Sequence, residues 1–324
     1  MRRRALVLAA LLSSAVAFSQ NMQPLGPAGR LAPLPRDGEG KGSIVPIFIY
    51  HSIRPYRPRD NRNARKYIAT PETLEKELAY LKENGYTSVT FADLTRNVTT
   101  GGPLPPRPVV ISFDDDWQSQ YLYAFPLLKK YGFTATFYVW TVVVGMKNHM
   151  TWDEVRELDR AGMEIGCHTR THPYLTRIKD DATLRREILG AKQRIEREIG
   201  KPVTSFAYPF GQYNERVVAM VKEAGFSSAR STWPGVTHTV EGLYSLTGFI
   251  RTEATSSLID AMTKAIAQAS EAASPGLTAA SAEAPPVSTL GTVEPSTAES
   301  APPAPVPPHV KSGPLSPWAI IDPP

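Results

Sequence analysis

The sequence predicts an α/β fold built on a parallel β-sheet, and three observations support this class. Strand-like and helix-like segments alternate between residues 44 and 262. The strand-like segments are apolar on both faces, as in "VVISF" at 109–113, which is typical of parallel strands buried between helices. Polar residues follow several strand ends, the edge where sites form in parallel barrels and in open sheets. The alternation itself leaves a barrel and a doubly wound sheet as alternatives.

Seven short runs rich in β-branched and aromatic residues have the length and composition of strands. In chain order they are 44–51 (IVPIFIYH), 107–115 (RPVVISFDD), 134–140 (TATFYVW), 163–168 (MEIGCH), 203–211 (VTSFAYPFG), 226–230 (FSSAR) and 244–250 (YSLTGFI).

Capping residues and apolar spacing predict the helices between these strands. The helix in 70–85 begins with Thr70 as its cap and Pro71 at its first position. Thr151 and Glu154 form a capping box at the start of 151–162. Further helices are predicted over 123–132, over an amphipathic stretch from 184 to 199, and over 215–224.

Composition divides the chain into four parts. Residues 1–19 join three arginines to an apolar run that ends in small residues, which is typical of a secretory signal peptide and shorter than the roughly 20 residues of a membrane span. Residues 20–43 read as a linker, 44–262 as the folded domain, and 263–324 as a disordered tail rich in Pro, Ala and Ser. We therefore expect an exported protein, periplasmic or extracellular, without a transmembrane span after cleavage. The tail could dock a partner, and a frayed end is the alternative.

Charge and cysteine content exclude two classes of protein. The formal net charge is +5, and no run of Lys and Arg resembles a nucleic-acid-binding stripe, so nucleic acid is not an expected partner. The single cysteine, Cys167, excludes an internal disulfide framework. Its apolar surroundings predict a buried thiol with a packing role.

Two motifs at strand ends indicate a metal site. The run "DDD" at 114–116 is usually a solvated loop, and that is the alternative reading. "HTRTHP" places His168 and His172 four residues apart, and two imidazoles at this spacing can converge on one metal. One added carboxylate leaves open positions for water and substrate and suits Zn²⁺, with non-haem Fe²⁺ as an alternative. A neighbouring aspartate, which points in a different direction, could act as the base.

These residues resemble a known family. "SFDDDWQS", "HTRTHP" and "FAYPFGQYN" occur in the order found in NodB-type polysaccharide deacetylases, carbohydrate esterase family 4, over about residues 44–255. The resemblance implies a distorted (β/α)7 barrel. It also implies metal-dependent hydrolysis of an N-acetyl group from a sugar.

By position, the resemblance assigns roles to individual residues. It implies Asp114 as the general base and a divalent metal, Zn²⁺ with Co²⁺, Ni²⁺ or Fe²⁺ as alternatives, bound by Asp115, His168 and His172. It further implies that the backbone N–H of Phe210, which follows Pro209, helps to bind the oxyanion.

Three departures distinguish the sequence within that family. Asp116 stands where the family usually has Gly, and its charge is expected to shift the pKa of Asp114. The family's arginine would fall near Ala207, so the contact that orients the base is expected to be missing. The leucine–histidine motif near the domain's end, which normally supplies the family's general acid, is absent. Instead the "FIYHSI" histidine, His51, is similar to that of the poly-β-1,6-N-acetylglucosamine deacetylase branch (PgaB and IcaB), where it is taken as the acid. A structural histidine at the barrel mouth is the alternative.

Further side chains are candidates for substrate contacts. Tyr208 and Trp233 could line a sugar cleft, and core packing is the alternative for both. Arg251, at the end of the last predicted strand, could contact the acidic residues of the site, or it could form a surface ion pair.

The sequence thus favours an exported N-deacetylase acting on a polysaccharide that contains N-acetylglucosamine, with poly-β-1,6-N-acetylglucosamine as the expected polymer. Chitin or peptidoglycan deacetylation and O-acetyl ester hydrolysis use the same machinery and remain alternatives. A polysaccharide-binding or scaffold protein with a weakened site is the alternative from another class.

Overall fold

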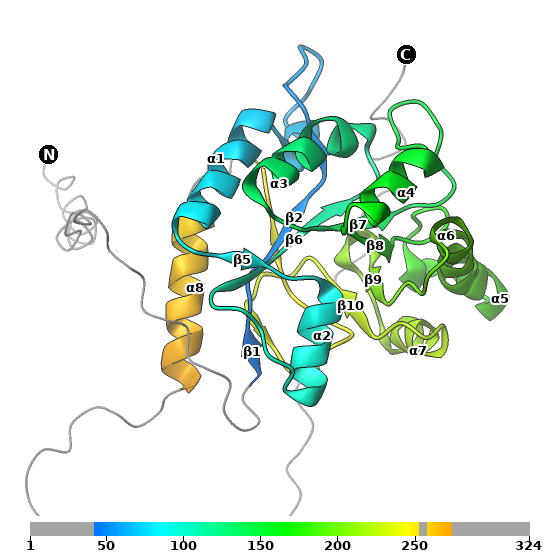
Figure 1. The fold of residues 1–324 in the computed structure, drawn as a ribbon. Helices are drawn as coiled ribbons and strands as arrows, with labels where there is room; N and C mark the ends of the chain where they lie inside the picture. The colour runs from blue at the N-terminus through cyan, green and yellow to red at the C-terminus, as the bar shows by residue number, and fades with distance from the viewer. Residues whose placement is uncertain (1–41, 253–257, 274–324) are drawn as a thin grey trace, which may run out of the picture.

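Seven parallel strands form a curled sheet that helices surround (Figure 1), in a computed structural model that describes residues 42–252 and 258–273. Along the sheet the strands are ordered β10 (Ser228–Arg230), β9 (Ser205–Ala207), β8 (Glu164–Cys167), β7 (Thr136–Val139), β6 (Pro108–Asp114), β2 (Ile47–Tyr50) and β12 (Phe249–Ile250). From β6 to β10, strands that follow one another in the chain are neighbours, and β12 returns beside β2. The architecture is a distorted (β/α)7 barrel, which confirms the predicted fold class.

The last predicted strand, 244–250, differs from its prediction. Only its final two residues pair with β2. Leu246 instead bonds to the opposite edge of the sheet, where its N–H donates to Ala229 O (3.0 Å) and its carbonyl accepts from Ser231 N–H (2.8 Å). The segment therefore joins both edges of the curled sheet, because it contacts β10 first and β2 afterwards.

Four short strands lie outside this path. β1 (Ser43–Ile44) pairs antiparallel with β11 (Thr237–His238), and β5 (Thr87–Ser88) pairs with the start of β6. β3 (Ser52–Ile53) and β4 (Ile68–Ala69) pair in parallel and hold the two ends of residues 54–67. This excursion begins directly after β3 and ends in a 3₁₀ turn, Ala64–Tyr67.

The predicted helices form with the predicted caps. The Thr70 side chain accepts from Thr73 N–H at the start of α1, and Thr151 and Glu154 form the capping box of α4. The helices are α1 (Pro71–Glu83), α2 (Phe91–Thr100), α3 (Phe125–Tyr131), α4 (Trp152–Arg160), α5 (Asp181–Arg185), α6 (Ala191–Ile199), α7 (Glu215–Glu223) and α8 (Leu258–Ala273). Two π-helical turns, Gln120–Ala124 and Arg186–Gly190, precede α3 and α6.

Helix α2 was not predicted, although it has a capping box of Thr90 and Asp93. It contains the sequon "NVT" at 97–99. Asn97 is buried, its side-chain amide donates to Gly102 O at 2.6 Å, and its amide oxygen accepts from the Ser43 hydroxyl. A glycan on this nitrogen would break that hydrogen bond, so Asn97 has a structural role.

The predicted boundary between domain and tail, at residue 263, falls inside α8. Met262 and Ile266 of this helix are buried against the domain, and Figure 1 shows α8 running along its side. The predicted signal peptide (1–19) and most of the predicted linker and tail lie outside the described residues. Within residues 42–252 and 258–273, no helix has the length and apolar character needed to cross a bilayer.

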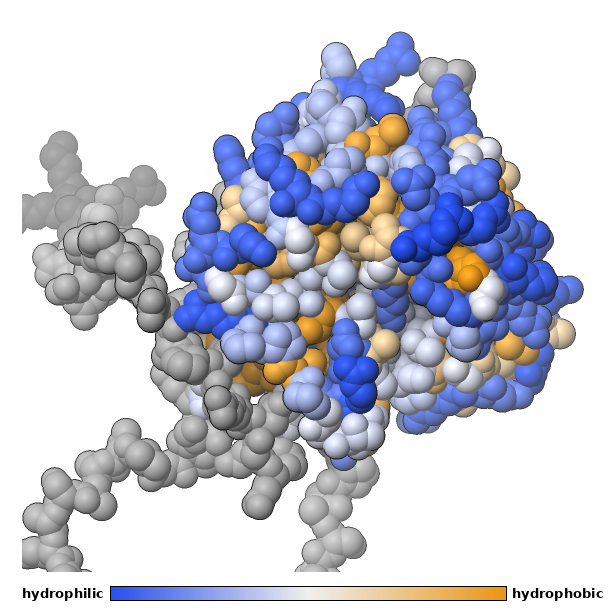
Figure 2. Space-filling view, in the orientation of Figure 1, coloured by the Kyte–Doolittle hydropathy of each residue, from blue (hydrophilic) through white to orange (hydrophobic). Residues whose placement is uncertain are grey.

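The core lies between the sheet and its helices, and the face in Figure 2 is covered largely by hydrophilic residues. Cys167, the last residue of β8, is fully buried, and burial raises the pKa of its thiol to about 12. The thiol is therefore a packing group, as its apolar neighbours in sequence predict.

A buried histidine makes the domain acid-sensitive. The ring Nε2–H of His238 donates to Val45 O (2.8 Å), and burial lowers the pKa of His238 from 6.5 to about 4. Because the unfolded chain binds the proton at higher pH, this group makes the folded state less stable as pH falls from 6.5 to 4, by about 3 kcal/mol. In urea unfolding at pH 7 and pH 4.5, His238→Gln should lose less stability on acidification than the parent. Equal losses would exclude His238 as the source.

Candidate active site

A cavity of about 360 Å³ opens at the C-terminal ends of the barrel strands. Asp114 is the last residue of β6, His51 directly follows β2, and His168 directly follows β8. The lining residues are His51, Asn63, Lys66, Tyr67, Asp114, Asp115, His168, His172, Tyr174, Tyr208, Phe210, Thr232 and Ile250. The strand ends therefore bring together the residues of all three motifs.

Asp115, His168 and His172 form a cluster that fits a divalent metal. Asp115 Oδ1 lies 3.4 Å from His168 Nε2 and 3.3 Å from His172 Nε2. This oxygen is buried and has no hydrogen-bond partner among the described residues. His168 Nδ1–H donates to Ala207 O (2.8 Å), which leaves the Nε2 lone pair facing the cluster. A set of two imidazoles and one carboxylate suits Zn²⁺ and leaves coordination positions open.

Two of the three groups in the cluster, Asp115 and His172, are held in the forms that bind a metal. Burial lowers the pKa of His168, but the contact with Asp115 and the charge of Asp114 outweigh burial and raise it. Burial raises the pKa of Asp115, but its contacts with the imidazoles of His168, His172 and His51 outweigh burial and hold that pKa well below its usual range. Burial lowers the pKa of His172 to about 4, so its imidazole is neutral at pH 7. A carboxylate and a neutral imidazole are the forms that coordinate.

Strained backbone directs these side chains. Seven described non-glycine residues have positive φ, and five of them belong to the motifs: Asp115 (75°), Asp116 (41°), Thr169 (72°), His172 (54°) and Phe210 (60°). Such conformations cost about 1–3 kcal/mol each and cluster at functional sites. At Asp115 and Asp116 they turn consecutive carboxylates toward different partners, so the acidic run is a buried turn and not a solvated loop.

Asp114 forms a buried ion pair with Arg230, and the expectation that no arginine would contact the base is wrong. The Arg230 side chain is fully buried, lies over the Tyr138 ring (4.9 Å) and contacts Asp114 Oδ1. Arg230 is the register partner of Ala207 in the neighbouring strand. The guanidinium therefore comes from the adjacent strand to the edge where the family's arginine was expected.

The environment of Asp114 keeps it ionised. Burial raises its pKa, but the charges of Arg230, His168 and His51 outweigh burial and lower the pKa below the usual value. The carboxylate is thus available as a proton acceptor at neutral pH.

His51 approaches the second oxygen of Asp114, Oδ2, whereas Arg230 contacts Oδ1. The Nε2 atom of His51 is 3.9 Å from Asp114 Oδ2, and the His51 ring meets the edge of Tyr67 at 5.1 Å. Burial lowers the pKa of His51, against the charges of Asp115 and Asp114 that raise it. The Gln120 side-chain amide donates to both His51 O (3.0 Å) and Asp114 O (2.6 Å), which ties the two strand ends together.

Asp116 faces away from Asp114. Its carboxylate accepts from Trp140 N–H (3.3 Å) and lies 3.6 Å from His149 Nδ1, and burial raises the pKa of Asp116 to about 6. The His149 ring stacks on Trp117 at 4.7 Å. Through these contacts with Trp140 and His149, Asp116 holds residues 140–149 beside the site.

The "YPFG" turn supplies one wall of the cavity. The Phe210 ring stacks on Tyr174 (3.9 Å) and meets His172 edge-on (4.7 Å). Tyr208 is buried, and its hydroxyl donates to Tyr244 O at 3.0 Å. This hydrogen bond holds the Tyr208 ring in the cavity wall. Pro209 is buried and does not line the cavity.

Two predicted contact residues lie away from the cavity. Trp233 is 54% exposed and only its neighbour Thr232 lines the cavity. Arg251 is buried and pairs with Glu77 of α1, whose other oxygen accepts from the Tyr50 hydroxyl (2.5 Å). Arg251 therefore joins β12 to α1 and contacts none of the site's carboxylates among the ion pairs of the described residues.

The structure also adds residues that the motifs did not indicate. Arg230, Gln120, Tyr67 and Lys66 belong to the site or touch it. An arginine at the end of the predicted strand 226–230 was the one signal for Arg230. Tyr67 and Lys66 come from the excursion 54–67, which has no strand or helix periodicity.

Comparisons with known proteins agree with this geometry. The family model described as polysaccharide deacetylase matches residues 101–229. The Bacillus subtilis protein YxkH is 27% identical over 206 residues, which are 64% of this chain and 71% of that protein. A poly-β-1,6-N-acetyl-D-glucosamine N-deacetylase of Staphylococcus aureus is 25% identical over 198 residues, 57% of this chain and 66% of the relative, just under two thirds of its length.

A solved structure has the same fold. The Streptococcus pyogenes deacetylase PplD, in complex with acetate, superposes with a TM-score of 0.65 at 25% identity and covers 68% of this chain and 99% of its own. The barrel, the cavity at its strand ends and these matches lead to one conclusion. Residues 101–229 match a polysaccharide deacetylase domain, and the barrel around them is similar to known carbohydrate deacetylases.

Proposed function

We propose that the chain is an exported, metal-dependent N-deacetylase of a polysaccharide that contains N-acetylglucosamine. The observation that carries this proposal is the convergence in one cavity of the Asp115–His168–His172 cluster, the Asp114–Arg230 pair and His51. A metal-ligand set beside an ionised carboxylate and an imidazole is suited to hydrolysis of an amide.

Two observations support poly-β-1,6-N-acetylglucosamine as the polymer. One relative carries that substrate in its name, although it is only 25% identical. His51, at the end of β2, also occupies the place where the resemblance puts the acid of that branch. Chains with β-1,4 linkage are the competing substrates, because linkage is read by the shape of the cleft.

Each of these residues has a separate role in the proposed reaction. A divalent cation bound by Asp115, His168 and His172 would polarise the acetamide carbonyl and make a water molecule more acidic. Asp114 accepts a proton from the attacking water, and Arg230 holds the carboxylate in place. The Phe210 N–H is the proposed donor to the oxyanion. Because burial lowers the pKa of His51, its imidazole is neutral before the reaction, and it receives the proton that Asp114 takes from the water. His51 gives this proton to the nitrogen as the C–N bond breaks, which releases acetate and the free amine.

Removal of the metal tests this proposal. The full chain, treated with chelator, should lose acetate release from β-linked N-acetylglucosamine oligomers and recover it with Zn²⁺. His172→Ala should weaken Zn²⁺ binding by at least about tenfold, whereas His238→Gln, which removes a histidine outside the cavity, should not. Calorimetry measures the affinity, and acetate assays on β-1,6 and β-1,4 oligomers measure activity and linkage. Bound Zn²⁺ without acetate release from either oligomer would favour the binding-protein alternative.

Export is tested separately. Residues 1–19 are proposed to be a cleaved signal, so the mature protein should begin after residue 17 or 19 and be recovered outside the cytoplasm. N-terminal sequencing of the protein from cell fractions measures both.

A further inference from the structure

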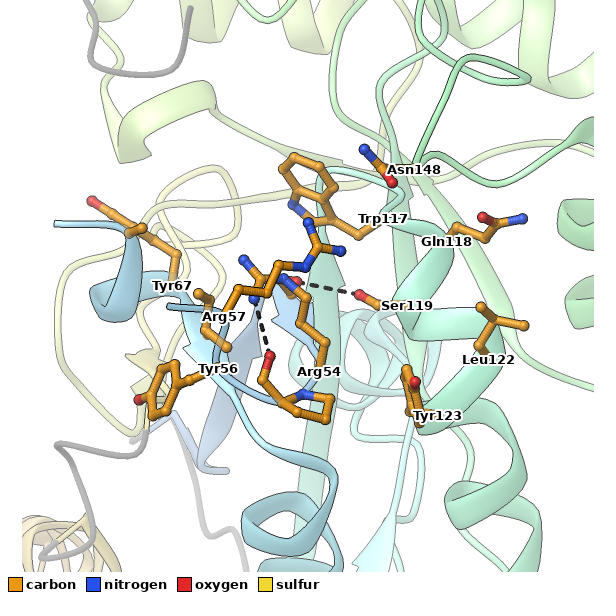
Figure 3. A pocket seen from close by; sticks show the side chains of 14 residues that line it. Arg54, Tyr56, Arg57, Tyr67, Trp117, Gln118, Ser119, Leu122, Tyr123 and Asn148 are labelled. Atoms are coloured by element: carbon orange, nitrogen blue, oxygen red, sulfur yellow. Dashed lines mark hydrogen bonds between the residues drawn. The ribbon is translucent and has the colours of Figure 1, made fainter. Parts of the chain in front are cut away.

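A second cavity, of about 340 Å³, lies beside the active site and shares one wall with it. Tyr67 lines both cavities, and the consecutive residues His51 and Ser52 line one cavity each. Figure 3 shows Tyr67 on one side of the second cavity and Trp117 at one end, and we call this cavity the Trp117 pocket. Because Tyr67 also contacts the His51 ring (5.1 Å), a polymer that fills both cavities passes by the proposed acid.

The walls of the Trp117 pocket are largely apolar and already in place. Four aromatic side chains line it, which are Tyr56, Tyr67, Trp117 and Tyr123. The Trp117 ring is held by stacking on His149, at 4.7 Å and 22° between the ring planes. Ala64 and Ile68 also line the pocket, and both are buried. The rings are therefore positioned before any ligand arrives.

The wall opposite Tyr67 exposes two large apolar side chains to water. Leu122 is 54% exposed and Tyr123 is 40% exposed, and Figure 3 shows both on that side of the pocket. They belong to the π-helical turn Gln120–Ala124, and single π-helical turns inside helices are frequent at functional sites. Large apolar side chains exposed together at a cavity are typical of a binding site.

The polar groups of the Trp117 pocket suit an uncharged ligand. Arg54 donates to both oxygens of Asp60 (2.8 and 2.9 Å), so its charge is compensated within the wall. The Arg57 side chain is exposed to water, which screens its charge. The Gln118 side-chain amide lies 3.5 Å from Glu154 Oε1, too far for a strong hydrogen bond, so it can donate to a ligand instead. The pocket thus presents neutral hydrogen-bonding groups beside apolar rings.

We propose that the Trp117 pocket binds the uncharged N-acetylglucosamine unit next to the one that reacts. This inference rests on the proposed deacetylase function and narrows its substrate to chains of at least two units. The face of a pyranose ring carries C–H groups, which pack against aromatic rings, and its hydroxyl groups need hydrogen-bond partners. A volume of 340 Å³ lies at the lower end of the roughly 300–1,000 Å³ of small-molecule sites, which suits a single sugar unit.

The affinities of short oligomers test the proposal. The probes are the methyl glycoside of N-acetylglucosamine and the corresponding β-1,6-linked disaccharide. Calorimetry on the full-length Asp114→Asn protein in excess Zn²⁺ measures binding without turnover. The disaccharide should bind about tenfold more tightly than the monosaccharide, and Trp117→Ala in the same background should remove most of that ratio. Trp117→Phe keeps a flat ring and should keep most of the ratio.

Trp152→Ala is the matched control, because Trp152 is also a partly buried tryptophan but lines neither cavity. It should keep the ratio. Tyr123→Ala is a second test that spares the core, since Tyr123 is exposed, and it should lower the ratio about threefold. Equal affinities for the monosaccharide and the disaccharide would overturn the proposal. A ratio that stays unchanged in both Trp117→Ala and Tyr123→Ala would overturn it as well.

The position of deacetylation gives an independent readout. The pocket lies on one side of the active site, so one end unit of a tetrasaccharide has no neighbour to place in it. The parent protein should leave that end unit acetylated longest, and Trp117→Ala should weaken this preference, as mass spectrometry of the products shows. Equal rates at both ends would contradict the proposal. The absence of acetate release together with the tenfold affinity ratio would count against the deacetylase function and for the pocket as a sugar site.

Discussion

Replacement of Asp114 by Asn is expected to lower the rate of acetate release by about 10²–10⁴-fold and to leave Zn²⁺ affinity unchanged. The amide has the shape of the carboxylate but cannot accept the proton of the attacking water. Asp114 is not part of the metal cluster, whose carboxylate belongs to Asp115. Acetate assays at saturating Zn²⁺ and calorimetry of Zn²⁺ binding measure the two quantities on the same protein.

Asp116→Asn is the matched control for this experiment. Asp116 is also buried and follows β6, but its oxygen accepts from Trp140 N–H, which an asparagine oxygen can still do. This variant should keep most of its activity. Full activity in Asp114→Asn, or equal losses in both variants, would contradict the assignment of Asp114 as the base.

Replacement of Arg230 by Met is expected to lower the free energy of unfolding by about 3–5 kcal/mol. The methionine fills much of the same space under the Tyr138 ring but leaves the Asp114 carboxylate buried without its positive partner. Activity should fall as well, because the carboxylate loses the group that holds it in the cavity. Urea unfolding of the metal-free protein at pH 7 gives the stability change.

A double-mutant cycle separates the ion pair from simple loss of packing. In the Asp114→Asn background, Arg230→Met should cost much less than in the parent, because no carboxylate is then left uncompensated. If Arg230→Met costs the same in both backgrounds, the contribution of Arg230 comes from its packing against Tyr138 and not from the ion pair.

The metal cluster could be predicted because its signals are local. Asp115 lies in one short motif, and His168 and His172 lie in another, each directly after an apolar strand. In a parallel barrel such strand ends meet at one edge, so two motifs were enough to bring the side chains together. Their converging distances confirm the geometry that this rule predicts, and the metal itself remains a proposal.

The partner of Asp114 could not be predicted in the same way. Arg230 lies 116 residues from Asp114, in the short strand "SAR". Its place depends on the register between β9 and β10, which sets Arg230 opposite Ala207. A one-residue shift would point the side chain away from the site, and no local pattern specifies that register.

The secondary structure also depends partly on local sequence signals and partly on contacts between distant segments. Helices α1 and α4 begin at capping residues that read directly from the sequence. The segment 244–250 reads as one strand, but Leu246 bonds to the β10 edge of the barrel, so only Phe249–Ile250 forms β12 and pairs with β2. Arg251 likewise reads as a site residue, and its pairing with Glu77 follows from the position of α1 beside β12.

The sequence by itself determined the alternation of strands and helices, the strand-end motifs and the residues of the candidate metal cluster, because each depends on neighbours within a few positions. Only the tertiary structure decided which arginine faces the base, which aromatic residues line the cavity, and that the basic excursion 54–67 forms a pocket beside it. These contacts join segments that are distant in the chain. They arise when the curling of the sheet brings its strand ends together, and that closure depends on the packing of the whole barrel.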